Sequence, residues 1–111
     1  MKIVVDDKIP FIRGILEIYG KVIYAPGGAI DNEMVKDTDA IIIRTRTKCN
    51  KQLLKNSSVK FIATATIGYD HIDKDYCSAH NIKWVNAPGC NAKSVEQYMT
   101  AALLYLHIHD Q

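Results

Sequence analysis

Residues 40–64 read AIIIRTRTKCNKQLLKNSSVKFIAT, and this stretch decides the predicted fold. Its two continuous apolar runs, 41–43 and 61–63, are typical of strands that are covered on both faces, as in a parallel sheet. Between them, Asn50 is a plausible N-cap for a helix over residues 51–55. The stretch therefore predicts a strand, a helix and a second strand, joined by a right-handed crossover.

The same alternation of short apolar runs and helix-like segments continues in both directions along the chain. We expect Asp73 to cap one of these helices and Asn81 to end it. Five strand–helix repeats predict an α/β fold, with a parallel five-stranded sheet and helices on both faces. The further predicted strands are residues 3–5, 22–24 and 84–85, and the further predicted helices are 10–20, 32–37, 74–80 and 92 to the end.

The last predicted helix begins at about Ala92 and is apolar around most of its circumference. A helix with so broad an apolar surface usually covers a second surface as well as its own core. Because the sequence stops at Gln111 without a helix cap, we expect it to be truncated.

Composition and charge narrow the classes of function. The formal net charge is only +2 and looks dispersed, so we expect neither nucleic acid nor an anionic membrane as a partner. No apolar run approaches the roughly 18 residues of a membrane helix. Because a strand-like run follows Met1 and Lys2 directly, we expect no signal peptide. The three cysteines lack metal-binding or CxxC spacing, which indicates reduced thiols and a cytoplasmic location.

Ligands of such sheets collect beyond the carboxyl ends of the strands. The loop at residues 44–48, RTRTK, brings three cations and two hydroxyls to that edge. A guanidinium offers paired donors to a phosphate or carboxylate, and hydroxyls add neutral donors. The loop therefore predicts an anion site, with either Arg44 or Arg46 as the charged contact.

The loop at residues 64–73, TATIGYDHID, follows the next predicted strand. Its small residues and Gly68 favour close approach of a ligand to the backbone, and Thr66 is a candidate hydroxyl donor. His71 and the two aspartates are better explained as turn and cap residues than as metal ligands, so no metal is expected.

The loop at residues 86–92, NAPGCNA, opens onto the last predicted helix. Its Pro-Gly turn predicts a rigid corner. Cys90 is not favoured as a nucleophile, because no base is demonstrably beside it.

The segments VDDKIP, IIIRTRTK, FIATATIGYDHID and VNAPGCNA occur in this order, and together they resemble the start of the D-isomer-specific 2-hydroxyacid dehydrogenases. The resemblance covers essentially the whole chain and extends to a branch that acts on a phosphorylated hydroxyacid. It implies a flavodoxin-like substrate-binding domain, split in sequence by an inserted Rossmann domain. Residues 1–91 would then belong to the substrate-binding domain, and 92–111 would start the long inter-domain helix.

The resemblance also implies roles for particular residues. Thr45 and Thr66 are similar to substrate-binding residues of the family, although many members have Ser at the position of Thr45. Arg44 is expected to assist with the phosphate, and the backbone of Ile67 and Gly68 to lie near the substrate carboxylate and the nicotinamide of NAD.

The resemblance also implies that the catalytic residues lie outside this chain. It puts the catalytic Arg, Glu and His beyond this chain, so no catalytic residue is expected here. None of the six glycines forms a G-x-G-x-x-G motif. We therefore expect the chain alone to be inactive, and its parent to be a homodimer.

Three alternatives remain from the sequence. A relative that oxidises a different phosphorylated hydroxyacid would share the same loops. A signalling receiver domain has a similar length and an acidic pair like Asp6 and Asp7, but Arg44 stands where its phosphoacceptor is needed. An interaction domain that dimerises through its last helix is the third alternative.

Overall fold

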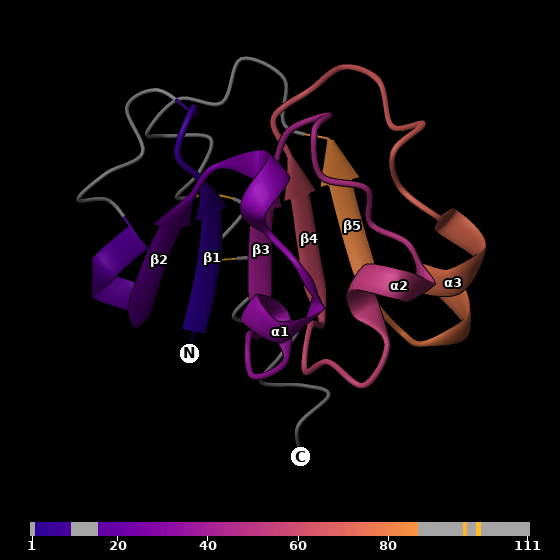
Figure 1. The fold of residues 1–111 in the computed structure, drawn as a ribbon, viewed down its shortest axis with the longest axis horizontal. Coiled ribbons are helices and arrows are strands. Elements are labelled where there is room, and N and C mark those ends of the chain that lie inside the picture. Colours follow the sequence, from indigo (N-terminus) through magenta and orange to yellow (C-terminus); the bar gives the residue numbers. More distant parts are fainter. Residues whose placement is uncertain (1, 10–15, 87–96, 98–99, 101–111) are drawn as a thin grey trace.

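The computed structural model describes residues 2–9, 16–86, 97 and 100. In this part of the chain, five strands form one sheet in which every neighbouring pair is parallel. The order across the sheet is β2-β1-β3-β4-β5 (Figure 1). The strands are β1 (Lys2–Asp6), β2 (Lys21–Ala25), β3 (Ala40–Ile43), β4 (Phe61–Thr64) and β5 (Lys83–Asn86).

The strand order has a switch point beside β1. From β1 the chain goes first outward to β2, and it then returns past β1 to β3 and continues in the other direction. This is the flavodoxin-like arrangement, in which ligands bind at the carboxyl ends of the strands near the switch. The predicted α/β fold with a parallel five-stranded sheet is confirmed.

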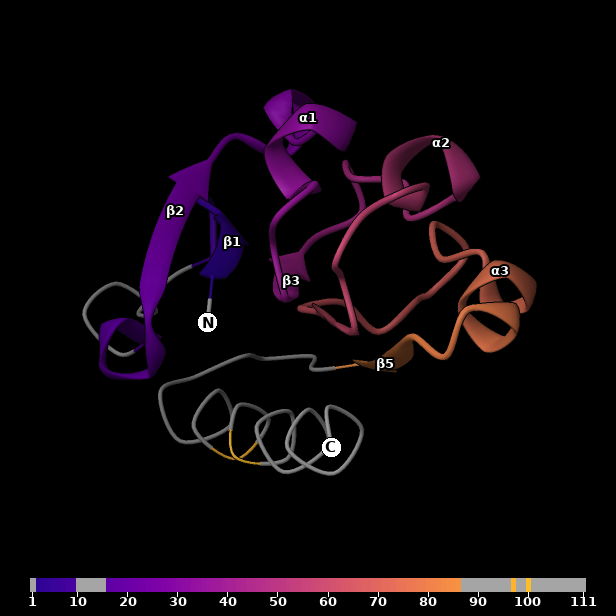
Figure 2. The same ribbon diagram turned by 90° about the horizontal axis from the view of Figure 1, so that it is seen from below.

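Short helices lie on both sides of the sheet, as predicted. Figure 2 shows α1, α2 and α3 along one side, and the 3-10 helix η1 (Leu16–Tyr19) on the other. A second 3-10 helix, η2 (Gly27–Ala29), follows β2. The α-helices are α1 (Asn32–Val35), α2 (Lys51–Leu54) and α3 (Lys74–Ala79).

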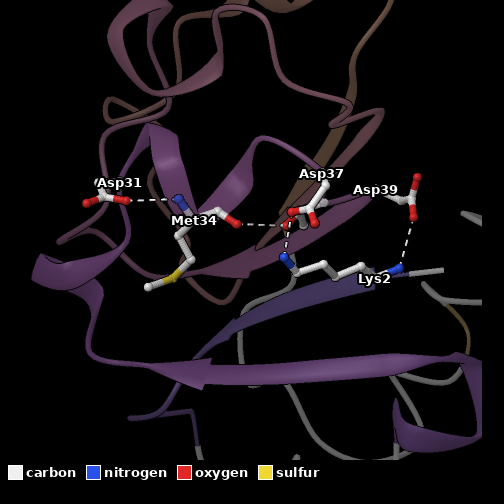
Figure 3. Close-up of polar contacts among 6 residues, drawn as sticks. Lys2, Asp31, Met34, Asp37 and Asp39 are labelled. Atoms are coloured by element: carbon white, nitrogen blue, oxygen red, sulfur yellow. Dashed lines mark hydrogen bonds and ion pairs between the residues drawn. The ribbon is translucent and has the colours of Figure 1, made fainter.

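Local side-chain chemistry fixes where these helices begin and end. Asn50 and Asp73 cap α2 and α3, as the sequence predicts, by accepting hydrogen bonds from backbone N–H groups three residues ahead. Asp31 does the same for α1 through the N–H of Met34 (Figure 3). Asn81 follows α3 with a φ of 58°, the left-handed conformation expected at a helix exit.

Two buried clusters explain why the strands are apolar without interruption. Ile42 belongs to the cluster on the η1 side, whereas its neighbours Ile41 and Ile43 belong to the cluster beneath α1, α2 and α3. Because successive side chains of a strand point to opposite faces, a strand covered on both faces needs apolar residues at every position. Every residue of β3 and β4 is accordingly buried.

Several sequence predictions fall outside the described residues. They are the first part of the helix at 10–20, most of the helix from 92 onward, and the corner at 87–92 with Cys90. The boundary between residues 91 and 92 also lies there. Within the described ranges, no helix is long and apolar enough to cross a membrane.

Two isoleucines provide a matched test of this core. Ile41 is fully buried, whereas the side chain of Ile18 is 77% exposed. We expect Ile41→Ala to lower the free energy of unfolding by about 2–5 kcal/mol, and Ile18→Ala to change it by less than about 0.5 kcal/mol. Urea unfolding followed by circular dichroism measures both, and equal losses would contradict the assigned core.

Candidate functional site

The loops that follow β3 and β4 start side by side at the carboxyl edge of the sheet. We call residues 44–48 the basic loop and residues 65–71 the threonine loop. At their beginnings, the N–H of Ala65 donates to the carbonyl of Ile43 over 2.8 Å. The pairing of the two strands thus continues into the loops and sets their relative position.

The same two loops are joined again where they end. The N–H of Cys49 donates to the carbonyl of His71, and the N–H of Asp73 donates to the carbonyl of Cys49, each over 2.8 Å. These bonds form an isolated parallel bridge between Cys49 and Ile72, and both of these residues are buried. The loops are therefore fixed relative to each other at both ends.

In the basic loop, one threonine is structural and the other is open to solvent. The buried hydroxyl of Thr47 donates to the carbonyl of Gly27 over 3.0 Å, which attaches this loop to η2. Thr45 is exposed and Arg44 is half-buried. Thr45 is thus the loop hydroxyl that a ligand in solvent can reach.

The two arginines of the basic loop have different surroundings. Arg46 and Lys48 line a hollow of about 500 Å³ that also involves residues of α1 and α2, and Arg44 does not line it. The sequence left open which arginine would contact an anion. The structure separates them, because Arg46 lies along the helix-covered side of the loop.

A tight contact that the sequence did not reveal lies beneath the basic loop. Asp6 is 1% exposed at the end of β1, and its Oδ1 accepts a hydrogen bond from the N–H of Lys8 over 2.8 Å. A Cβ atom at Gly27 would stand 2.7 Å from the other carboxylate oxygen, Oδ2, and 3.1 Å from the Cβ of Arg46. Only glycine fits between the buried carboxylate and the basic loop.

In and before the threonine loop, side chains form a continuous chain of hydrogen bonds. His71 Nε2 lies 2.8 Å from Thr64 Oγ1, which lies 2.8 Å from Thr66 Oγ1. Thr66 in turn donates to the carbonyl of Gly68 over 2.7 Å. Because a hydroxyl has one proton, Thr64 must donate to Thr66, and His71 must donate through Nε2.

This chain changes the expected role of Thr66. The sequence suggested that its hydroxyl donates to a ligand, but in the structure its proton is given to Gly68. The oxygen can still accept a hydrogen bond, and donation to a ligand requires the hydroxyl to turn away from Gly68. Such competition between local and ligand hydrogen bonds cannot be read from residue types.

The tip of the threonine loop is attached to β5 by hydrogen bonds and is otherwise exposed to solvent. The side-chain amide of Asn86, at the end of β5, donates to the carbonyls of Thr66 and Ile67 over 3.3 and 3.1 Å. Ile67 is 85% exposed, and a Cβ atom added to Gly68 would meet nothing within 4 Å. The backbone at Gly68 is therefore open to solvent.

Comparison with known proteins assigns the chain to a family. Residues 8–99 match the family described as D-isomer specific 2-hydroxyacid dehydrogenase, catalytic domain. The chain belongs to this family. The match excludes the receiver domain, whose fold has the same strand order and could not be separated by topology alone.

Curated members of the dehydrogenase family resemble the chain closely over part of their length. An erythronate-4-phosphate dehydrogenase of Bacteroides thetaiotaomicron is 59% identical over 105 residues, which are 94% of this chain and 30% of the relative. One of Porphyromonas gingivalis is 38% identical over 110 residues, covering 99% of this chain and 30% of the relative. The chain thus spans about a third of the length of these relatives.

Solved structures of the family have the same fold. An NAD⁺-bound 3-phosphoglycerate dehydrogenase of Entamoeba histolytica is 34% identical with a TM-score of 0.65, over 80% of this chain and 33% of that one. A D-lactate dehydrogenase of Aquifex aeolicus, complexed with NAD and lactic acid, is 25% identical with a TM-score of 0.66. That similarity covers 99% of this chain and 36% of the lactate enzyme.

The contact at Gly27 gives a prediction for the stability of this chain. We expect Gly27→Ala to destabilise the fold by about 1–3 kcal/mol, because the added methyl group would overlap the buried Asp6 carboxylate. Gly28→Ala is the matched control, since a Cβ atom there meets nothing within 4 Å. Thermal unfolding measures both variants, and equal midpoints for them would contradict the contact.

A second prediction concerns the titration of His71. Burial lowers its pKa, and the charge of Asp70 partly opposes the shift. The unfolded chain therefore binds more protons in mild acid, so stability is full above the unfolded pKa of about 6.5 and is lost as the pH falls through the folded pKa. We expect His71→Gln to remove this loss of stability while keeping a donor for Thr64.

NMR of the imidazole nitrogens checks the arrangement that underlies this prediction. The neutral ring should carry its proton on Nε2, and acid should add the second proton at Nδ1 without breaking the bond to Thr64. A neutral ring protonated on Nδ1 would be incompatible with the hydrogen-bond chain.

Proposed function

We propose that this chain is the substrate-holding part of an erythronate-4-phosphate dehydrogenase. The enzyme would transfer a hydride from the hydroxyl-bearing carbon of 4-phosphoerythronate to NAD, on a route to pyridoxal phosphate. The identity of 59% to the Bacteroides thetaiotaomicron relative supports this substrate. The observation that carries the proposal is the pair of loops joined at both ends, which holds Arg44 and Thr45 beside the threonine loop.

The proposed roles follow from the exposure and chemistry of the residues. The half-buried Arg44 offers paired donors for an anionic group of the substrate, and the exposed Thr45 adds a neutral hydroxyl. Thr66 contributes an acceptor oxygen from the neighbouring loop. The open backbone at Gly68 lets the substrate carboxylate approach closely.

Bound NAD would supply the hydride acceptor, and a base outside this chain would take the hydroxyl proton. Ile67 presents an exposed apolar side chain at the loop tip, which is suited to pack against the face of a planar ring such as nicotinamide. The chain has no G-x-G-x-x-G motif for the cofactor's phosphates. We therefore propose that the site for the cofactor's phosphates and the catalytic Arg, Glu and His lie outside these 111 residues, and that these residues alone do not catalyse turnover.

One alternative substrate has its own support. The identity of 34% to the Entamoeba histolytica enzyme favours 3-phosphoglycerate as the competing phosphorylated hydroxyacid. Both acids would use the same cationic and hydroxyl groups. The two acids should therefore be compared as substrates of the same enzyme preparation.

We also propose that the enzyme is cytoplasmic and that it forms a homodimer. Cys49 and Cys77 are free and buried, and burial raises the pKa of Cys77 to about 11, so both remain as unreactive thiols. This supports a cytoplasmic protein, in which cysteines stay reduced. The homodimer rests on the family resemblance alone.

The experiment measures NADH formation by the polypeptide purified at its natural full length. We expect kcat/KM for 4-phosphoerythronate to exceed that for 3-phosphoglycerate. Thr45→Val should lower kcat/KM by about 10–100-fold, because it removes a hydrogen bond to a charged ligand at nearly constant volume. Thr45→Ser, which keeps the hydroxyl, should stay within about threefold.

Two results would contradict the proposal. If 3-phosphoglycerate is the better substrate, the substrate assignment is wrong. If Thr45→Val and Thr45→Ser behave alike, Thr45 does not contact the substrate. Turnover by the 111-residue chain alone would separately contradict the placement of the catalytic residues.

A further inference from the structure

Positive charge is concentrated in one stretch of this chain. Residues 44–60 contain six Lys and Arg and no Asp or Glu, so the remaining residues carry eight Lys and Arg against all twelve Asp and Glu. The interpretation of the charge as dispersed was therefore wrong. The basic loop accounts for half of the six, and the other three are Lys51, Lys55 and Lys60.

These three lysines line a cavity of about 590 Å³ between α2 and α3. Lys60 and Ile82, which also lines it, come immediately before β4 and β5. The cavity thus lies near the amino ends of β4 and β5. The basic loop, by contrast, follows the carboxyl end of β3, at the opposite edge of the sheet (Figure 1). It is separate from the site proposed for the substrate.

The lysines of this cavity have no counter-ion in the described part of the chain. No Asp or Glu lines the cavity, and none of the three lysines forms an ion pair with a described residue. Lys2, by contrast, is paired with Asp37 (Figure 3). Lys51 begins α2 and Lys55 is its C-cap, whose N–H bonds to the carbonyl of Lys51, so the two like charges lie one turn apart and repel each other. A bound anion would relieve this repulsion.

The cavity also offers an aromatic surface. The rings of Tyr76 and His80 stack with their centroids 4.1 Å apart and an angle of 25° between their planes, and both residues line the cavity. His80 is exposed and Tyr76 is half-buried. A nucleobase commonly stacks on the open face of an aromatic side chain, and the exposed His80 ring is available for this contact. The cavity volume lies within the range of small-molecule sites.

We propose that this cavity binds a nucleoside phosphate, with the phosphates at Lys51, Lys55 and Lys60 and the base against the Tyr76–His80 pair. Inorganic phosphate would use the lysines but not the aromatic pair. The combination of uncompensated cations and stacked rings therefore favours a nucleotide. The proposal does not depend on the identity of the dehydrogenase substrate.

Calorimetric titration of ATP into the polypeptide at its natural full length tests the site. We expect the double substitution Lys51→Gln, Lys55→Gln to weaken ATP binding by roughly tenfold or more, since two charge-assisted contacts are lost. Lys21→Gln is the matched control, because Lys21 is exposed at the start of β2 and does not line the cavity. All three substitutions affect exposed side chains, so the fold should be retained.

A second comparison tests the contact with the base. His80→Ala should weaken binding of ATP severalfold and leave binding of inorganic tripolyphosphate unchanged. The proposal is overturned if ATP does not bind, or if its binding is insensitive to the double substitution, as expected for a nucleotide at a cofactor site. It is equally overturned if Lys21→Gln weakens binding as much, or if tripolyphosphate binds as tightly as ATP.

Discussion

The bridge between Cys49 and Ile72 is the constraint on which the proposed substrate site depends. It consists of backbone hydrogen bonds, and it lies inside the apolar cluster beneath the α-helices, where Val4, Ile41 and Ile62 also pack. Both bridging residues are buried, which limits the access of water to these bonds and strengthens them. The packing of the core therefore also holds the two ligand-facing loops together.

Buried threonines extend this constraint into the loops. Thr47 attaches the basic loop to η2, and Thr64 starts the hydrogen-bond chain that shapes the threonine loop. Both hydroxyls are satisfied within the protein, which avoids the cost of burying a polar group without a partner. The exposed Thr45 and the half-buried Thr66 are left at the surface between them. Four similar residues thus divide into two that build the site and two that can meet a ligand.

The sequence predicted the features that local chemistry decides. Unbroken apolar runs marked the strands, and the caps Asn50 and Asp73 needed only backbone groups within a few residues. It could not predict the fit of Gly27 against Asp6, because these residues belong to different strand–loop units that the sheet brings together. For the same reason the difference between Arg44 and Arg46 appeared only when the loop was placed against α1 and α2. Features set by contacts distant in sequence required the structure.

The cations of residues 44–60 lie at two opposite edges of the sheet, and the distance between these edges limits the electrostatic coupling between anions bound at them. β4 has four residues and connects the amino edge, beside the lysine-lined cavity, to the threonine loop. At roughly 3.3 Å per residue, it separates the edges by about 13 Å, which exceeds the screening length of about 8 Å at physiological ionic strength. An anion at one edge therefore changes the potential at the other only weakly through solvent. Strong coupling between the two sites would instead have to pass through the packing of α2, whose cap Asn50 directly follows the Cys49 bridge.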